Sequence, residues 1–299
     1  KFGGKAYETS GGLHGVGLSV VNALSDHLIV EVARDKAVWR QSYLRGNPTG
    51  KLKKIGKVSN RRGTSVTFHP DPKIFDLKAQ FRPSTLYRMA RSKAYLFRGV
   101  YIRWNCDTEL ISKNDSTPEK DTLHFPGGLM DYLATMLEDR VTITPNAFFG
   151  QAKLNGSSGS IEWAVAWPKD EDFLFNSYCN TVPTPLGGTH EAGLRSALTR
   201  GLRAYGELIN NKPASKIMAD DAVGSACVML SVFFPNPQFQ GQTKEKLTTV
   251  EAAKLVDTSI GDYFDHWLSG DPGTANLLLE HVIERSLTRL KKRQEKSLK

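Results

Sequence analysis

The sequence lacks the features that mark membrane, disulfide-rich and disordered proteins. Its 299 residues contain no apolar run near the roughly 18 residues that span a bilayer. Cys106, Cys179 and Cys227 are far apart and form no CxxC pair, so neither a disulfide framework nor a zinc site is predicted. Hydrophobic residues make up 39% and charged residues 24%, which is typical of globular domains. We therefore expect a folded protein of the reducing cytoplasm with no membrane segment and no assigned metal ligand.

The first residues also lack an initiator methionine and an apolar signal segment. The chain opens on Lys1-Phe2-Gly3-Gly4-Lys5, in the middle of a pattern. We expect it to be a piece of a longer protein.

Acidic residues are too few to balance the basic ones. The formal net charge is +9, which favours a polyanionic partner without identifying it. Residues 280–299 alone carry seven basic and three acidic side chains, a net charge of +4. Two interpretations stay open for this segment: contact with nucleic acid, or a solvated helix end whose cations complement the helix dipole.

Strand and helix signals are mixed along the whole chain, which predicts an α+β fold in two layers. Strands are predicted at residues 28–34, 37–44, 63–68, 100–104, 161–167, 173–182 and 226–234. Helices are predicted at residues 18–24, 84–97, 129–137, 189–209, 249–268 and 272–296. The pattern restarts at Pro126-Gly127-Gly128, which predicts two domains, residues 1–125 and 126–299.

A glycine-rich loop precedes the first predicted helix. Ser10-Gly11-Gly12-Leu13-His14-Gly15-Val16-Gly17 places four glycines within seven residues. Glycine allows close backbone approach, and the helix that follows offers unpaired N–H groups, so this segment predicts a phosphate cradle. Leu18 stands where a Walker loop needs lysine, and Val20 stands where a dinucleotide or kinase loop needs its third glycine.

A second short loop carries a lysine suited to phosphate chemistry. In Gln240-Gly241-Gln242-Thr243-Lys244-Glu245-Lys246, Lys244 is a point charge on a short glycine-containing loop. Such a lysine can contact a transferring phosphoryl group. For a lysine taken alone, the alternative of a solvated surface side chain stays open.

Together these strings resemble a known ATPase superfamily. The string GGLHGVG, followed by a VVNALS helix, resembles the ATP lid shared by gyrase, Hsp90 chaperones, histidine kinases and MutL, the GHKL ATPases. In this spelling it is similar to the B subunits of bacterial type IIA DNA topoisomerases, and residues 240–246 resemble their QTK loop. The resemblance covers essentially the whole chain. Residues 1–5 and 63–68 are closer to topoisomerase IV than to gyrase.

The resemblance implies a fold and a set of site residues. Residues 1–125 would be the C-terminal half of a GHKL ATPase domain, a two-layer α/β sandwich. Residues 126–299 would be a transducer domain similar to ribosomal protein S5 domain 2. Gln242 and Lys244 would sense the γ-phosphate. The implied ATP-binding residues are Lys1, Tyr7, Gly12, Leu13, His14, Gly15, Val16, Gly17, Leu18, Thr64 and Lys244.

Three further features follow from the same resemblance. Gly187-Gly188-Thr189-His190 matches a family turn, which we interpret as mainly structural, with Thr189 capping the next helix. Asp220-Asp221 matches an acidic pair, but Ala222-Val223-Gly224 follows where the family has Arg-Glu-Gly, which puts any polar role of positions 222 and 223 in doubt. The helix after the turn carries a broad basic face that we expect to face DNA, formed by Arg195, Arg200 and Arg203.

The implied function is ATP-driven passage of DNA through a dimeric gate. It would need ATP and Mg²⁺, a homodimer through the ATPase region, and a heterotetramer with the topoisomerase IV or gyrase A subunit. Two alternatives stay open: a gyrase B protein, and a non-enzymatic basic nucleic-acid-binding module. A chaperone or mismatch-repair ATPase is disfavoured by the QTK loop and the LHGVG spelling.

The 299-residue chain alone should not hydrolyse ATP. The family's general-base glutamate, magnesium-binding asparagine and adenine-reading aspartate belong to an upstream half that this sequence does not match. Phosphate release should therefore equal a no-protein blank in a coupled phosphate assay, and adding the upstream half should restore it. Turnover by clean 299-residue material would contradict the interpretation.

Overall fold

The computed structural model describes residues 15–76, 79–154 and 159–297, and the chain divides into two compact units. Of the described residues, 15–76 and 79–82 form the N-terminal unit, and 83–154 and 159–297 form the large unit. The predicted domain boundary after residue 125 divides the chain at another place and stays a prediction. Within the described residues, no helix combines the length and apolar content that a bilayer crossing demands.

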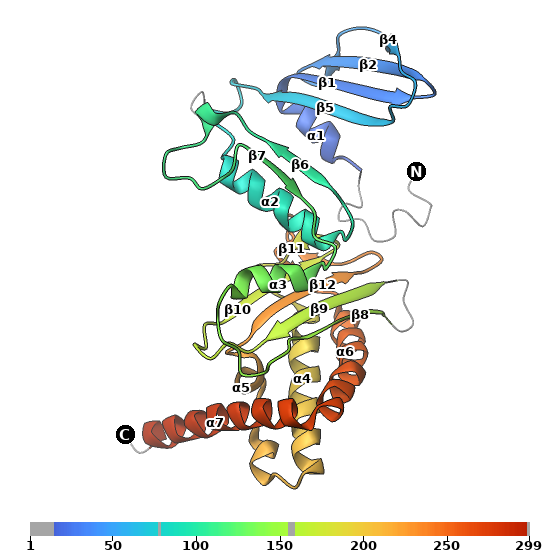
Figure 1. The fold of residues 1–299 in the computed structure, drawn as a ribbon. Coiled ribbons are helices and arrows are strands. Elements are labelled where there is room, and N and C mark those ends of the chain that lie inside the picture. Colours follow the sequence, from blue (N-terminus) through green and yellow to red (C-terminus); the bar gives the residue numbers. More distant parts are fainter. Residues whose placement is uncertain (1–14, 77–78, 155–158, 298–299) are drawn as a thin grey trace. The chain divides into compact units, whose positions relative to one another are not determined.

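The N-terminal unit is one short helix and an antiparallel sheet (Figure 1). The helix α1 spans Gly17–Ala23. The strands are β1 Ser25–Arg34, β2 Ala37–Leu44, β3 Asn47–Pro48, β4 Lys53–Lys57 and β5 Gly63–Pro70. Their order is β3-β2-β1-β5, and β4 also pairs with β2. The predicted helix and the three predicted strands of this unit are confirmed.

The β1–β2 hairpin follows from its two turn residues. Asp35 and Lys36 have φ of 52° and 59°. Paired left-handed residues match the right-handed twist of the flanking strands. The strand β4 was not predicted, because all five of its residues are exposed and its sequence KKIGK shows no apolar alternation.

The large unit is built on a mixed five-stranded sheet of order β11-β10-β12-β9-β8. The strands are β8 Phe148–Lys153, β9 Ser160–Ala166, β10 Leu174–Cys179, β11 Val182–Pro183 and β12 Cys227–Phe233. Only the β10–β12 pair is parallel within this sheet. The central strand β12 is buried on both faces: Val228 and Leu230 belong to one apolar cluster, Cys227 and Met229 to the other. This confirms the prediction of a buried strand at residues 226–234.

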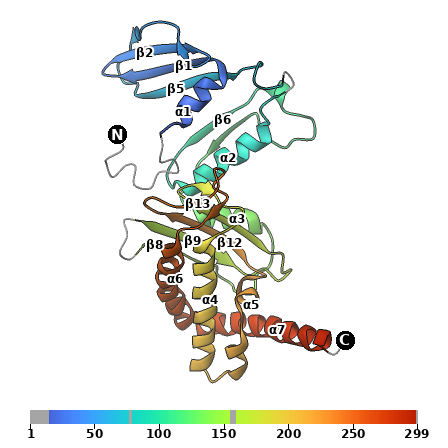
Figure 2. The ribbon, with the colours of Figure 1, turned by 180° about the vertical axis from the view of Figure 1, so that it is seen from behind.

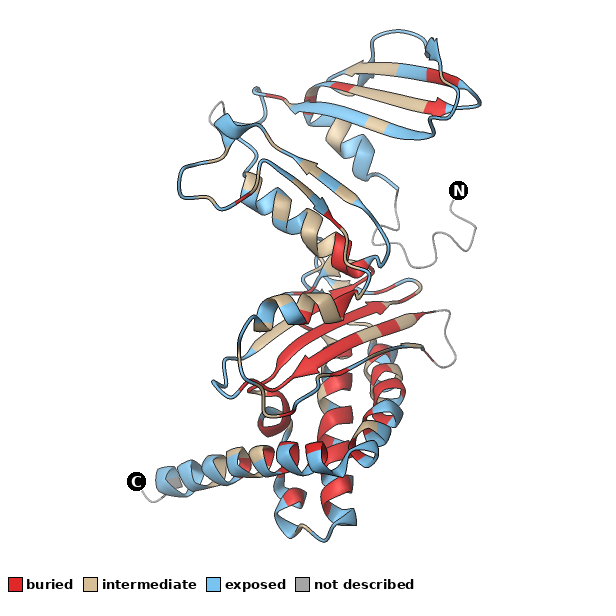
Figure 3. Cartoon of the chain, viewed as in Figure 1, coloured by how far each residue is buried: buried red, intermediate tan, exposed pale blue. Residues whose placement is uncertain are grey.

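Helices cover both faces of this sheet (Figures 1 and 2). One face packs against α3 (Leu129–Leu137) and the end of α2 (Pro83–Leu96). The other packs against α4 (Thr189–Leu208) and α6 (Val250–Gly270), and α7 (Pro272–Ser297) follows α6. Figure 3 shows the buried residues concentrated in this sheet and in α4 and α6.

Two glycines let α4 and α6 approach closely. A Cβ on Gly193 would lie 2.4 Å from the Ala253 carbonyl oxygen, and one on Gly201 would lie 2.6 Å from the Phe264 ring. The helix predicted at residues 189–209 is confirmed as α4. The apolar periodicity of the sequence did not predict how closely α4 packs against α6.

Short elements connect the main layers. They are the hairpin β6 Ile102–Asn105 and β7 Lys120–Leu123, the 3₁₀ turns Thr108–Leu110 and Lys212–Lys216, α5 Ala219–Val223, and the hairpin β13 Phe239–Gln240 and β14 Lys246–Leu247. The strand predicted at residues 173–182 is confirmed over Leu174–Cys179, but its predicted continuation to residue 182 was wrong. Asn180 and Thr181 turn the chain at φ of 49° and 64°, because the Asn180 amide bonds both the N–H and the carbonyl of Phe234, each at 2.8 Å.

Candidate functional site

The described part of the glycine loop has the backbone expected of a tight turn before a helix. Gly15 has φ of +62°, and α1 begins two residues later at Gly17. Val16 and Leu18 leave about half of their side chains exposed, at 53% and 52%. The other predicted nucleotide-binding residues of this segment lie outside the described residues: Lys1, Tyr7, Gly12, Leu13 and His14.

Thr64 lies at the start of β5, opposite Val32 of β1, with an exposed side chain. Gly63 before it has φ of +126°, while no heavy atom lies within 4 Å of a Cβ added there. Glycine is therefore required by the backbone conformation and not by crowding.

The loop carrying Gln242 and Lys244 is closed by the β13–β14 hairpin, which pairs Phe239 with Leu247. Lys244 is half-buried and adopts φ of +59°, a left-handed conformation that is unfavourable for lysine. Its Nζ lies 5.9 Å from the centroid of the Phe239 ring. Gln242 is exposed. A non-glycine residue held in this conformation persists only where its surroundings determine it.

A second contact holds the same loop from outside the hairpin. Leu247 N donates to Gly187 O at 3.0 Å, and Leu186 N donates to Glu245 O at 3.0 Å. Gly188 has φ of +145° and ψ of −164°, a region open almost only to glycine. A Cβ there would lie 2.3 Å from the Leu247 carbonyl oxygen. The turn at residues 186–188 thus supports the lysine loop, which the sequence did not reveal.

The predicted cap of α4 was wrong. The N-cap position is Gly188, which has no side chain, and Thr189 is the first helical residue. The Thr189 hydroxyl is buried without a hydrogen-bond partner among the described residues. Because Gly188 must meet the Leu247 backbone, the helix starts without a side-chain cap. His190 is fully buried beside Thr184, and burial lowers the pKa of its imidazole to about 4, so it is neutral at pH 7.

The three arginines of α4 are each tied to a partner in the large unit. Arg195 lies 5.2 Å from the Phe175 ring centroid and 3.7 Å from an Asp220 carboxylate oxygen. Arg200 pairs with an Asp257 oxygen at 3.2 Å. The Arg203 Nε donates to the Ile217 carbonyl at 2.8 Å. Their contact with DNA stays a prediction. Within the large unit, Arg195 and Arg200 are paired with carboxylates, and Arg203 is hydrogen-bonded to a backbone carbonyl.

Of the acidic pair before β12, Asp221 is the buried member and takes part in a hydrogen-bond network. This side chain is 4% exposed and accepts two parallel hydrogen bonds from the Arg289 guanidinium, each at 2.8 Å, and one from the Met218 N–H at 2.8 Å. Burial alone would raise the pKa of Asp221, but these donors outweigh it and the pKa is lowered. The side chain of Asp220 is 91% exposed.

The comparisons with known proteins decide the family. The family model described as DNA gyrase B matches residues 128–298, which is more than half of the chain. The chain belongs to the DNA gyrase B family. This confirms the resemblance to the B subunits of bacterial type IIA topoisomerases.

The similar proteins agree with this family. The chain is 53% identical over its whole length to a protein of Bartonella bacilliformis that is named as the B subunit of DNA topoisomerase 4, and 53% identical to the same-named protein of Caulobacter vibrioides. It spans 43% of each, so it corresponds to less than half of these relatives. A solved topoisomerase IV ATP-binding domain of Francisella tularensis, in complex with a small-molecule inhibitor, is 31% identical with a TM-score of 0.76. That match covers 94% of this chain and 75% of that one. The predicted α+β class of an ATPase and transducer is thereby confirmed.

Replacing Gly188 by alanine should destabilise the large unit. The added Cβ meets the Leu247 backbone and the φ/ψ pair is left to glycine, so we expect a loss of roughly 1–3 kcal/mol in the free energy of unfolding. Urea denaturation followed by circular dichroism measures it. The matched control is Gly270→Ala, where nothing lies within 4 Å of the new Cβ. Equal stability of the two variants would contradict the proposed contact.

Proposed function

We propose that this chain is the nucleotide-responsive part of a topoisomerase IV protein of the B type, in which ATP binding and hydrolysis drive DNA strand passage. The spelling of the lid string supports ATP, and the Bartonella and Caulobacter relatives, both named for DNA topoisomerase 4, support topoisomerase IV over gyrase. The observation that carries the proposal is Lys244, a lysine kept in a left-handed conformation by contacts on both sides of its loop.

The described residues fit the proposed ATP. Gly15 supplies a left-handed backbone next to the start of α1, and Thr64 presents an exposed hydroxyl beside a left-handed Gly63. In this proposal the residues that bind the phosphates are Gly12, Leu13, His14, Gly15, Val16, Gly17 and Leu18, with Lys1, Tyr7 and Thr64 around the nucleotide. Bound ATP with Mg²⁺ supplies the phosphoryl group that is hydrolysed.

Lys244 would offset negative charge at the γ-phosphate, and Gln242 would contact the same group. A fixed ammonium stabilises the charge of a transferring phosphoryl group without reorganising at the moment of reaction. The left-handed conformation of Lys244 limits the directions its side chain can take, so part of the positioning is achieved before nucleotide binds.

The outer end of α7 is the stronger candidate for DNA contact. Arg285 pairs with Glu171 at 2.6 Å and Arg289 pairs with Asp221, so these two charges are matched inside the unit. Lys292, Arg293 and Lys296 are exposed and line a groove of about 760 Å³, which Arg285, Arg289 and the carboxylates of Glu171, Asp220, Asp221 and Glu284 also line. Among the described residues, no carboxylate within ion-pair distance is assigned to these three side chains.

As partners we propose a second copy of the same protein through the ATPase region and the topoisomerase IV A subunit in a heterotetramer, acting on DNA in the cytoplasm. The relatives are themselves named as subunits, which supports a multi-chain enzyme.

In the full-length protein, Lys244→Ala should lower ATP hydrolysis on the order of 10³-fold, with a smaller loss of nucleotide binding. Lys244→Asn should do the same, because asparagine tolerates the left-handed backbone and removes only the ammonium. Lys246→Ala is the matched control, since Lys246 is an exposed lysine two residues away. Wild-type turnover in both Lys244 variants, measured by steady-state phosphate release, would refute the assignment.

The triple variant Lys292→Ala, Arg293→Ala, Lys296→Ala should weaken duplex DNA binding and flatten its salt dependence. Each lost phosphate contact lowers the slope of log affinity against log salt by about one unit. Fluorescence anisotropy with a short duplex at several salt concentrations measures the slope.

The charge-matched control replaces three exposed lysines elsewhere, Lys169, Lys212 and Lys254, by alanine. A third variant replaces Arg195, Arg200 and Arg203. If the control flattens the slope as much as the α7 variant, the effect reflects net charge and the α7 site is wrong. A larger effect of the α4 variant would assign DNA contact to that helix instead.

A further inference from the structure

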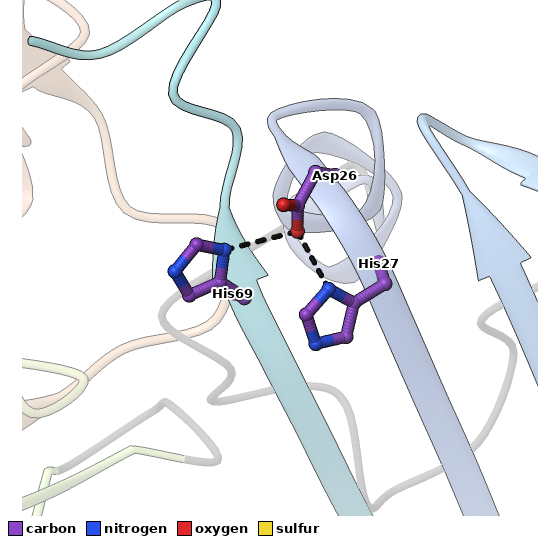
Figure 4. A group of neighbouring side chains, drawn as sticks. All are labelled: Asp26, His27 and His69. Atoms are coloured by element: carbon purple, nitrogen blue, oxygen red, sulfur yellow. Dashed lines mark hydrogen bonds and ion pairs between the residues drawn. The ribbon is translucent and has the colours of Figure 1, made fainter. Parts of the chain in front are cut away.

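The start of β1 brings together three side chains of the types that ligate metal ions. Asp26 and His27 are adjacent in sequence and would project to opposite sides of a regular strand. Here the register of β1 against β5 shifts between Ser25 and His27, so that Ser25 faces Pro70 and His27 faces His69. Such a bulge redirects side chains of the bulged strand. Asp26 and His27 therefore converge with His69, the cross-strand neighbour (Figure 4).

The three side chains already contact one another. One oxygen of Asp26, Oδ1, lies 2.7 Å from His27 Nδ1 and 3.0 Å from His69 Nδ1. The two imidazole rings are stacked, with centroids 5.4 Å apart and planes 12° from parallel. All three ligand atoms lie within 4.8 Å of one another. Ligands of one tetrahedral Zn²⁺ are separated by about 3.3 Å, given Zn–N and Zn–O bonds of about 2.0–2.2 Å.

Side-chain rotation can bring the ligand atoms from separations of up to 4.8 Å to the roughly 3.3 Å of a tetrahedral site. The side chains of His27 and His69 are 52% and 57% exposed, so their rings can turn without repacking a core. The Asp26 side chain is 23% exposed. The nearby Arg45 is bound by Asp71, with Nε at 2.5 Å from Oδ2, so it does not occupy the Asp26 carboxylate.

We propose that Asp26, His27 and His69 form a binding site for a divalent transition-metal ion, with Zn²⁺ as its natural occupant. Two imidazoles and one carboxylate are a donor set that Zn²⁺ accepts, and three protein ligands leave the fourth position to water. Each imidazole would bind through Nδ1 and carry its proton on Nε2. The cysteine pattern of the sequence gave no sign of this site, because none of its ligands is a cysteine.

The site would brace the corner between α1 and the sheet. Ser25 Oγ donates to the Val21 carbonyl at 2.6 Å, and Asp71 N donates to the Leu24 carbonyl at 2.9 Å, so the ends of β1 and β5 already meet at the end of α1. A metal ion joining Asp26 and His27 to His69 would strengthen the same junction. Binding to the folded state alone would raise its stability.

The test uses the 299-residue chain without a histidine tag, dialysed against chelator and then against metal-free buffer. Isothermal titration with Zn²⁺ should show one ion bound per chain, and Co²⁺ in its place should give the visible absorption of a tetrahedral site. Asp26→Asn, His27→Gln and His69→Gln should each weaken Zn²⁺ binding by at least about tenfold, since even second-shell changes cost 10–100-fold. Zn²⁺ should raise the melting temperature of the wild type and not of these variants.

The matched controls are His266→Gln and Asp35→Asn, an exposed histidine and an exposed carboxylate elsewhere in the chain. Both should bind Zn²⁺ as the wild type does. The proposal is overturned if the wild type binds no stoichiometric Zn²⁺, or if Asp26→Asn and His69→Gln bind it with unchanged affinity. Because all three ligands are at the surface, loss of binding with an unchanged far-ultraviolet circular dichroism spectrum separates a lost ligand from a lost fold.

Discussion

The backbone contact between Gly188 and Leu247 connects the main layers of the large unit. It joins the turn that leads into α4 to the strand β14 that leads into α6, and these two helices cover one face of the central sheet. The loop that bears Gln242 and Lys244 lies between β13 and β14, so its position is set by the same contact. Only glycine fits at residue 188, because its backbone conformation and the neighbouring Leu247 leave no place for a Cβ.

In the large unit, the buried carboxylate of Asp221 is paired with an arginine, whereas the basic side chains near the end of α7 are exposed. The side chain that is almost fully buried, Asp221, is matched by a bidentate arginine and a backbone N–H, as a buried carboxylate requires. Along α7 the matched residues Arg285 and Arg289 come first, and the exposed cations come after them. The arginines nearer the start of α7 are thus paired within the fold, and the basic side chains nearer its end are exposed.

The N-terminal unit shows how one irregularity can create a candidate site. A regular β1 would separate Asp26 from His27 on opposite faces. The bulge at this point instead places them together with His69, with two imidazoles around one carboxylate oxygen. The lowered pKa of Asp26 agrees with this arrangement: partial burial alone would raise it, but the His69 hydrogen bond and the His27 backbone N–H outweigh that effect.

The sequence by itself determined the elements that depend on local patterns and the family that depends on short strings. Apolar periodicity was sufficient to predict α4, α6 and the doubly buried strand β12. The lid and QTK strings were sufficient to predict the family. Tertiary structure alone decided the turn at Asn180, the uncapped start of α4, the partner of Asp221, and the convergence of Asp26 with His69. Each of these joins residues distant in the chain, or depends on a register shift, whereas periodicity and motif spacing report only what neighbouring residues do.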